Sequence, residues 1–409
     1  MKDFFKVTPI DEVLDHAATF LKVDTQFLPV QNSPGRILAT DVASDINIPD
    51  FSRSTMDGYA VRAKSTFGAS EANPAYFTIK GAIAMGETPI FSIGPEEAVR
   101  IPTGGMLPKG ADSVVMIEHT DAIDETMLEV YRSVAPGQHV VGIGEDIQKD
   151  RIILAKGTRI RPQETGLLAA LGIQSVSVYR RPTVAVISTG DELIPIDETP
   201  SGGKIRDINS YTLAGLVEEA GGIPLRFGIV CDDFDRLRET CSQAVSQADM
   251  VLISGGSSVG TRDFTIDVIS SLPDSDILVH GISISPGKPT ILGRVGNKMF
   301  WGLPGHVVSA MVVFKMVVRP FMDRISGRSS ANAPPHHIPA RLSRNIASAQ
   351  GRTDYIRVRL VYKDQELWAE PVIGKSGLIS TMVKADGLIE IELNTEGLDQ
   401  GGVVKVIPL

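Results

Sequence analysis

Three short apolar runs in the second half of the chain share one pattern, because each is followed by polar residues and then by a helical periodicity. They cover residues 183–187, 227–230 and 250–253. Buried strands that alternate with helices are typical of βαβ units. With the apolar run 299–301 and the long helical pattern over 307–322, they predict a doubly wound parallel α/β domain over residues 180–327.

The pattern differs before and after this domain. Apolar residues at helical spacing near the N-terminus predict a helix that begins after Thr8 as N-cap, with Pro9 first and an apolar face of Ile10, Val13, Leu14, Ala17, Ala18 and Leu21. Residues 46–148 carry short strand-like runs separated by Pro and Gly, which predicts a small β domain. It is inserted into a helical N-terminal domain of residues 1–45 and 149–179. Residues 334–409 alternate like strands and predict a C-terminal β barrel or sandwich.

Acidic or small polar residues follow each of the three apolar runs. Glu192 follows the first, Asp232 the second and Asp263 the third. The carboxyl ends of parallel strands share one edge of a sheet, and open α/β sheets bind ligands there. We therefore expect these three carboxylates to hold Mg²⁺, which prefers oxygen ligands and substrate phosphates. One such carboxylate alone is more often a helix N-cap.

The third run leads into a glycine-rich loop that contains Ser254, Gly255, Gly256, Ser257, Ser258 and Gly260. Glycine allows close approach of the backbone to a ligand, and free N–H and hydroxyl groups suit phosphate oxygens. A plain strand-to-helix turn explains such a loop equally well when it is taken alone. The acidic residues after the neighbouring strands favour a phosphate and metal site.

Composition limits the partners. The chain has 409 residues, of which 43% are hydrophobic and 22% charged, and its net charge of −9 argues against nucleic acid as a partner. No apolar run approaches about 18 residues, so no membrane association through a spanning helix is expected. The N-terminus does not read as a secretory signal. Cys231 and Cys241 offer no disulfide framework or zinc spacing, so a cytoplasmic location is expected.

Six motifs in order carry a resemblance to a known family. They are Met56-Asp57-Gly58-Tyr59-Ala60, the Pro102 to Asp112 stretch with Pro102-Thr103-Gly104-Gly105, Ser188-Thr189-Gly190-Asp191-Glu192-Leu193, the Ser254 to Asp263 loop, Pro286-Gly287-Lys288-Pro289 and Gly302-Leu303-Pro304-Gly305. Each is weak alone, and Asp57-Gly58 by itself reads as an ordinary turn. Together, and over nearly the whole chain, they resemble the molybdopterin molybdenumtransferase family, which is similar to the E domain of gephyrin.

The resemblance implies an enzyme of molybdenum cofactor biosynthesis that inserts molybdate into adenylylated molybdopterin and releases AMP, assisted by Mg²⁺. It also implies a homodimer with a composite active site between the α/β domain of one subunit and the inserted β domain of the other. The implied catalytic residues are Asp57, Thr103, Asp146, Glu192 and Asp263. Besides the glycine-rich loop, the implied substrate-binding residues are Ser188, Thr189, Gly190, Arg206, Asp207, Asn209, Ser210, Lys288, Pro304 and Arg352, although Arg352 could also be an ordinary surface arginine.

The sequence departs from the family pattern at three places. Many members carry lysines where this chain has Gly281 and Ser285, and Asn-Pro where it has His306-Val307. Fewer cations beside an oxyanion would weaken molybdate binding, although His280 or His306 offers a titratable substitute. Two alternatives therefore stay open: a weakly catalytic or non-catalytic molybdopterin-binding scaffold, and a molybdopterin adenylyltransferase, whose domain is similar to residues 180–327. The β domains argue against the second.

Overall fold

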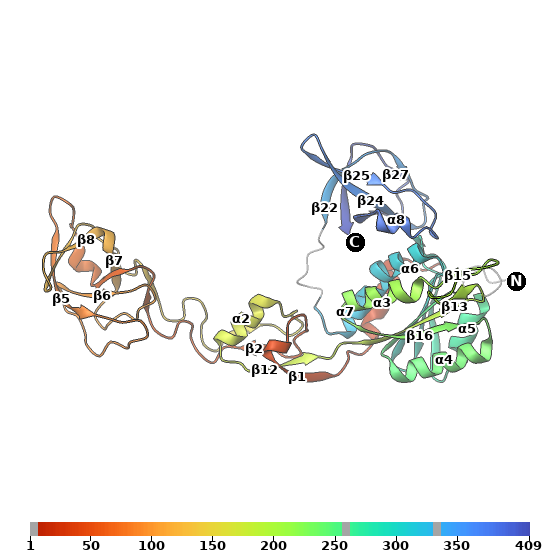
Figure 1. The fold of residues 1–409 in the computed structure, drawn as a ribbon, viewed down its shortest axis with the longest axis horizontal. Coiled ribbons are helices and arrows are strands. Elements are labelled where there is room, and N and C mark those ends of the chain that lie inside the picture. The colour runs from red at the N-terminus through yellow and green to blue at the C-terminus, as the bar shows by residue number, and fades with distance from the viewer. Residues whose placement is uncertain (1–6, 256–261, 330–336) are drawn as a thin grey trace. The chain divides into compact units, whose positions relative to one another are not determined.

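The structure, a computed structural model, describes residues 7–255, 262–329 and 337–409, and the side chains of residues 262 and 263 are not described. The chain forms two compact units (Figure 1). Unit 1 consists of residues 1–40, 156–166 and 174–409, and unit 2 of residues 41–155 and 167–173.

A six-stranded sheet is the centre of unit 1. Its strands are β13 (Thr183–Thr189), β16 (Ile223–Val230), β17 (Met250–Ser254), β18 (Ser275–His280), β20 (Ile291–Val295) and β21 (Lys298–Leu303). Their spatial order is β16-β13-β17-β21-β20-β18, in which the first four are parallel and β20 runs antiparallel to both neighbours. The three strands predicted from the apolar runs are therefore adjacent and parallel, and the doubly wound α/β domain is confirmed.

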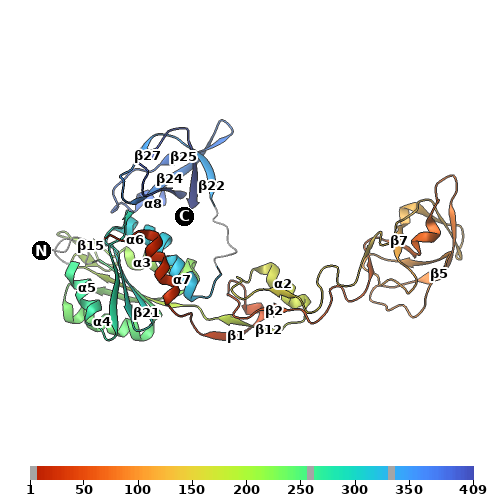
Figure 2. The same cartoon turned by 180° about the vertical axis from the view of Figure 1, so that it is seen from behind.

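Helices cover both faces of this sheet (Figures 1 and 2). On one face lie α3 (Asn209–Glu219), α6 (Val307–Val313) and α7 (Arg319–Ile325), and on the other α4 (Phe234–Gln247) and α5 (Arg262–Ser270). Alternate residues of β13 enter different cores, Val184 and Val186 one and Ala185 and Ile187 the other. A strand buried on both faces reads as a continuous apolar run, which is why the sequence pattern identified it.

The predicted helix over 307–322 is continuous from α6 through a π-helical turn, Phe314–Val318, into α7. The predicted N-terminal helix is only partly present. It ends after α1 (Ile10–Asp15) and tightens into a 3₁₀ turn, His16–Thr19. Leu21, expected on its apolar face, is 67% exposed because the helical register does not extend that far. Thr8 is not the cap; its backbone instead bonds to Gly281 and Ser283.

The rest of the N-terminal part of the chain contains one strand pair in unit 1 and a helix whose first half belongs to unit 1 and whose second half belongs to unit 2. β1 (Thr25–Pro29) pairs antiparallel with β12 (Ser175–Tyr179). Helix α2 (Pro162–Ala170) begins at a proline, as expected from the fixed φ of that residue. It ends before Gly172, whose φ of 70° suits a helix terminus.

The C-terminal domain is a closed barrel of five strands. These are β22 (Ile338–Leu342), β24 (Thr353–Lys363), β25 (Glu366–Pro371), β26 (Gly387–Ile391) and β28 (Val403–Pro408), with α8 (Ser380–Val383), β23 (Ile346–Ala347) and β27 (Gly397–Leu398) between them. The ring closes because β24 pairs with both β25 and β26. β19 (Ile284–Ser285), which follows β18, also pairs with β24 and joins the barrel to the α/β domain. The predicted barrel is confirmed.

Unit 2 is a β structure with two small apolar cores. Its six-stranded sheet has the order β7-β4-β6-β5-β9-β8, formed by β4 (Gly58–Val61), β5 (Ala75–Ala82), β6 (Glu97–Ile101), β7 (Ser113–Met116), β8 (Thr120–Ala122) and β9 (Met127–Val130). Two short pairs complete it: β2 (Val42–Ala43) with β11 (Ile152–Leu154), and β3 (Arg53–Ser54) with β10 (Val140–Val141).

Candidate functional site

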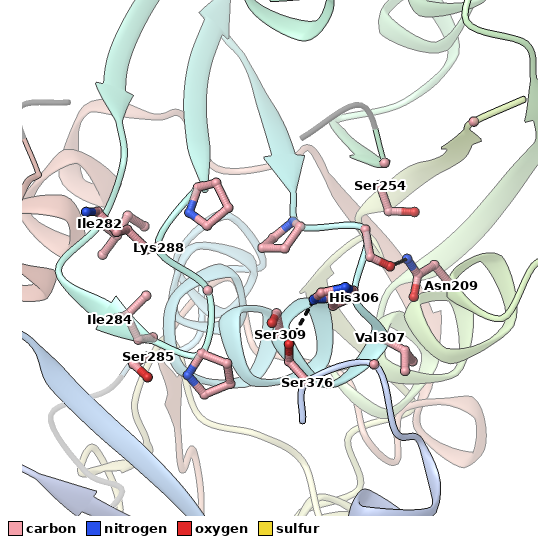
Figure 3. A pocket seen from close by; sticks show the side chains of 18 of the residues that line it. Asn209, Ser254, Ile282, Ile284, Ser285, Lys288, His306, Val307, Ser309 and Ser376 are labelled. Atoms are coloured by element: carbon pink, nitrogen blue, oxygen red, sulfur yellow. Dashed lines mark hydrogen bonds between the residues drawn. The ribbon is translucent and has the colours of Figure 1, made fainter. Parts of the chain in front are cut away.

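A cavity of about 970 Å³ lies in unit 1 at the carboxyl ends of the parallel strands (Figure 3). Its wall contains Thr189 from the end of β13, Asp232 from just after β16, and Ser254 from the end of β17. Pro304, which follows β21, also lines it. The ligand edge that the strand order predicts for an open α/β sheet is thus a real hollow.

Two of the three predicted metal ligands line this cavity. They are Glu192, which is exposed, and Asp232, whose carboxylate accepts a hydrogen bond from the Thr189 hydroxyl at 3.0 Å. Gly190 has a φ of 151°, which favours glycine. A Cβ there would lie 2.6 Å from the carboxylate of Glu192, so the Glu192 side chain would have to shift.

The side chain of Asp263, the third predicted ligand, lies outside the described residues. Among side chains that are described, no group of three potential ligands surrounds a common point. Mg²⁺ is commonly held by one or two carboxylates together with substrate phosphates and water. Glu192 and Asp232 fit such a site, and the set of three stays a prediction.

Gly255 shows why a glycine must follow the third strand, β17. Its φ is 116°, and a Cβ would lie 1.9 Å from the carbonyl oxygen of Thr189. The hydroxyl of Ser254 beside it is buried and has no hydrogen-bond partner among the described residues. The remaining loop residues of the prediction, Gly256, Ser257, Ser258 and Gly260, lie outside the described residues.

A buried carboxylate organises the start of α3. Asp207 is 5% exposed and accepts hydrogen bonds from the Ser188 hydroxyl at 2.9 Å, from the Ser210 backbone N–H at 3.1 Å and from the Ser210 hydroxyl. Asp207 lines the cavity, whereas Ser188 and Ser210 do not. These two serines therefore position Asp207 and α3, and their predicted contact with a ligand is not provided by the described geometry.

Asn209, the first residue of α3, presents an unsatisfied acceptor. Its side-chain amide nitrogen donates to the Gly305 carbonyl oxygen at 2.8 Å, which fixes the orientation of the amide. Its Oδ1 atom is buried and has no partner in the described structure. Figure 3 places Asn209 beside Ser254 and His306. A buried polar atom without a partner costs free energy, and a bound ligand or water would satisfy it.

Three cationic residues of the prediction also line the cavity. Lys288 is exposed, on a turn where Gly287 packs so closely that a Cβ would lie 2.3 Å from Val313. Arg206 donates to the Glu198 carbonyl oxygen at 3.0 Å. Arg352 forms a salt bridge of 2.9 Å with the buried Asp354, so its charge is partly neutralised before any ligand binds.

Only some of the residues discussed as departures from the family pattern, or as substitutes for its lysines, line the cavity. Ser285 and His306 line the cavity, whereas Gly281 and His280 do not. His306 Nδ1 lies 2.8 Å from the hydroxyl of Ser376 in the C-terminal domain (Figure 3). Sequence reasoning missed Ser376 because it comes from a different domain and belongs to no motif.

The predicted site residues Asp57, Thr103 and Asp146 belong to unit 2 and do not line this cavity. Asp57 accepts hydrogen bonds from the Thr103 N–H at 2.7 Å and the Thr103 hydroxyl at 3.1 Å. These bonds, the N–H first, lower the pKa of Asp57, so it is a carboxylate at neutral pH. Gly58 opens β4 rather than a turn, and a Cβ there would lie 1.9 Å from the Val115 carbonyl oxygen. Asp146 is exposed, and its side chain makes no hydrogen bond within the described part of the chain.

Comparison with known families accounts for almost the whole sequence. The chain matches the MoeA N-terminal region (domain I and II) over residues 8–172, a probable molybdopterin binding domain over 185–324, and the MoeA C-terminal region (domain IV) over 339–409.

Individual relatives match over similar lengths. The molybdopterin molybdenumtransferase of Bacillus subtilis is 33% identical over 406 residues, which are 98% of this chain and 93% of that one. The enzyme of the same name from Haemophilus influenzae is 34% identical and covers 94% of both chains. A putative molybdopterin biosynthesis protein of Methanocaldococcus jannaschii is 37% identical over 97% of this chain and 94% of its own.

Solved structures agree with these relatives. A molybdopterin biosynthesis MoeA protein from Pyrococcus horikoshii OT3 superposes with a TM-score of 0.83 at 31% identity, covering 99% of this chain and 100% of that chain. None of the helices in the described chain has the length and apolar character that a membrane crossing requires. Because relatives above 30% identity extend over nearly its full length, the chain belongs to the molybdopterin molybdenumtransferase (MoeA) family.

Proposed function

We propose that this protein is a molybdopterin molybdenumtransferase, which inserts molybdate into adenylylated molybdopterin and releases AMP. The observation that carries the proposal is the cavity itself, in a chain of this family. Two carboxylates, a lysine and a close-packed strand-to-loop glycine surround one hollow at the ligand edge of the sheet. A pyrophosphate-containing substrate requires this combination of negative metal ligands and positive or N–H donors.

Different side chains of the cavity wall suit different parts of the substrate, according to their charge. Lys288 places an ammonium group for a phosphate oxygen, and the glycine-rich loop after Ser254 is predicted to add backbone N–H donors. The unsatisfied Asn209 Oδ1 accepts hydrogen bonds only, so it suits an N–H or O–H of the pterin or ribose and not a phosphate. Glu192 and Asp232, with Asp263, would hold Mg²⁺, which when bound neutralises charge on the phosphoryl oxygens.

The proposal includes a homodimer. Asp57, Thr103 and Asp146 of unit 2 would serve a site whose cavity belongs to the partner subunit, as the family resemblance implies. The Asp57–Thr103 pair supports this, because an exposed carboxylate held by two donors is ready for an external ligand. A cytoplasmic location is proposed on the free cysteines, Cys231 and Cys241.

One assay separates this function from its alternatives. Purified protein is incubated with adenylylated molybdopterin and Mg²⁺, with and without molybdate, and AMP is measured. Molybdate-dependent AMP release is the expected result. Tight pterin binding without AMP release would contradict the proposal and indicate a scaffold. That alternative is favoured by Ser285 in the cavity wall, at a position where the family pattern has lysine. Formation of adenylylated molybdopterin from molybdopterin and ATP would indicate an adenylyltransferase.

A further inference from the structure

A second and smaller pocket in unit 1 has a strongly basic wall. Its volume is about 40 Å³, and six arginines line it: Arg36, Arg159, Arg180, Arg181, Arg319 and Arg328. Tyr179 also lines it, and the ring of Tyr179 has the ammonium groups of Lys22 and Lys156 at 5.5 and 6.0 Å from its centroid. The pocket shares no lining residue with the larger cavity. In a chain of net charge −9, this is a local reversal of charge.

Carboxylates balance only part of this charge. Three arginines have carboxylate partners: Arg180 with Asp249 and also with Asp24 at 3.8 Å, Arg319 with Glu219 at 3.2 Å, and Arg328 with Asp323 at 3.3 Å. Glu219 and Asp323 are the two carboxylate residues in the described wall of the pocket. Positive charge therefore exceeds negative charge there even after every ion pair is counted.

The other three arginines keep most of their hydrogen-bonding capacity. Arg36 donates one N–H to the Tyr179 carbonyl oxygen at 2.8 Å, and Arg181 one to the Gly221 carbonyl oxygen at 3.1 Å. The side chain of Arg159 makes no hydrogen bond or ion pair within the described residues. Burial, and then the charge of Arg181, lower the pKa of Arg36, which reflects two like charges close together.

We propose that this pocket binds a small tetrahedral oxyanion, either free phosphate or the terminal phosphoryl group of a larger molecule. The planar fork of a guanidinium matches such oxygens in pairs, and Arg36, Arg159 and Arg181 have N–H groups available. A volume of about 40 Å³ holds only a few water-sized groups, so a phosphoryl end enters and a nucleoside does not. The bound anion links Arg159 to Arg181 and stabilises the folded chain, because it binds the folded state alone.

The test uses the full-length protein and inorganic phosphate as the probe. Thermal unfolding is followed as phosphate replaces chloride at constant ionic strength, and the wild type should show a saturable rise in Tm. Arg159→Gln should need at least about tenfold more phosphate for half of this rise, because a charged hydrogen bond to the anion is lost. The Arg159 side chain has no described partner, so this change should leave the fold intact. Arg181→Gln should act in the same direction.

Two matched variants locate the effect. Arg238→Gln removes the same charge from the exposed surface of α4, and Lys288→Gln removes a cation from the larger cavity. Arg238→Gln should keep the phosphate response of the wild type. Lys288→Gln should keep the part of the response that depends on Arg159, whatever phosphate binds in the larger cavity. A parallel titration with AMP distinguishes the two sources, because its effect depends on Arg159 only if the site accepts a terminal phosphoryl group.

Three results would overturn the proposal. The first is a phosphate response that is the same in Arg159→Gln as in the wild type. The second is a response that disappears in Lys288→Gln. The third is a changed sedimentation coefficient of Arg159→Gln with an unchanged phosphate response, because the arginines would then contact a second copy of the chain.

Discussion

At the scale of single residues, the carboxylates differ in whether other groups already occupy them. Asp207 is saturated by two serines, and Asp354 holds Arg352. Glu192 and Asp232 line the cavity as Asp207 does, but they have fewer partners and keep the capacity to hold a further ligand. The sequence alone does not show which of these carboxylates have partners. Only the structure distinguishes the carboxylates that hold other side chains from those that can bind a ligand.

The metal assignment predicts a large effect of Asp232→Asn. The change keeps the size of the side chain and its contact with Thr189 but removes the charge, so AMP release at saturating Mg²⁺ should fall by roughly a hundredfold, since metal stabilisation of phosphoryl charge contributes several kcal/mol. Asp233→Asn is the matched control, because Asp233 caps α4 and an asparagine caps equally well. Equal activities of the two variants would remove Asp232 from the site.

Ser285 gives a prediction about molybdate. Ser285→Lys should strengthen molybdate binding, because it restores a cation in the cavity wall, and the gain should shrink as salt rises since the Debye length falls to about 8 Å at physiological ionic strength. Ser285→Met, of similar length and no charge, is the control for packing. Isothermal titration at two salt concentrations measures the difference. If both variants bind molybdate alike, charge at this position does not matter.

The Asp57–Thr103 pair predicts a pH dependence. The folded pKa of Asp57 is lowered, so the stabilisation from this contact is present above the ordinary carboxyl pKa of about 4 and is lost as pH falls through the lowered value. Thr103→Val removes the hydroxyl donor and keeps the N–H donor, and should raise the pKa of Asp57 part of the way back. Carbon NMR titration of the carboxyl groups measures this shift, and Thr103→Ser should leave it unchanged.

At the scale of elements, the shape of the cavity depends on the close approach of the backbone at the ends of two strands. β13 and β17 end side by side, and Gly190 and Gly255 turn away there with positive φ. Gly255 is required because a side chain would meet the Thr189 carbonyl oxygen of the neighbouring strand, and the φ of Gly190 also favours glycine. The elements therefore supply the shape of the site, and the side chains supply its charge.

Gly255→Ala tests this element. The added Cβ would lie 1.9 Å from the Thr189 carbonyl oxygen, and φ is unfavourable for alanine, so we expect a loss of stability of about 1–3 kcal/mol and loss of substrate binding. Gly215→Ala in α3 is the control, since a Cβ there meets nothing within 4 Å and alanine favours helix by about 1 kcal/mol. Denaturant unfolding compares the two, and a neutral Gly255→Ala would show that the backbone there can relax.

At the scale of the whole molecule, the groups implied in catalysis come from two compact units. Glu192, Asp232 and Lys288 belong to unit 1, whereas Asp57 and Thr103 belong to unit 2. The family resemblance implies that they meet in a composite site across two subunits. This proposal can be tested with dimers that combine two different variants.

Mixed dimers provide that test. Asp57→Ala and Asp232→Asn proteins, each expected to be inactive, are refolded together in equal amounts. In a two-fold dimer with composite sites, one site of each mixed dimer receives both changes and the other neither, so about a quarter of wild-type activity should return. Differently tagged subunits confirm that mixed dimers form. If activity stays at the level of the separate variants, both residues act within one subunit.

The sequence by itself determined the elements and the ligand edge of this protein. Its continuous apolar runs over 183–187 and 250–253 specified strands buried on both faces, and the residues after them indicated the edge at which the cavity lies. Such signals are local, because strand burial and glycine requirements are properties of a few neighbouring residues. Two details of the N-terminal helix escaped this reasoning: α1 tightens into a 3₁₀ turn after Asp15, and the backbone of Thr8 bonds to Gly281 and Ser283.

Only the tertiary structure decided which motif residues face the cavity. Ser188 and Ser210 donate hydrogen bonds to Asp207 and do not line the cavity. Ser285 lines the cavity, whereas Gly281 does not. Ser376, from the C-terminal domain, contacts His306. The basic pocket likewise brings together Arg36 and Arg328, which are far apart in the sequence. These outcomes depend on the packing of segments far apart in sequence, and hydrophobic periodicity carries no information about which polar side chains such packing brings into contact.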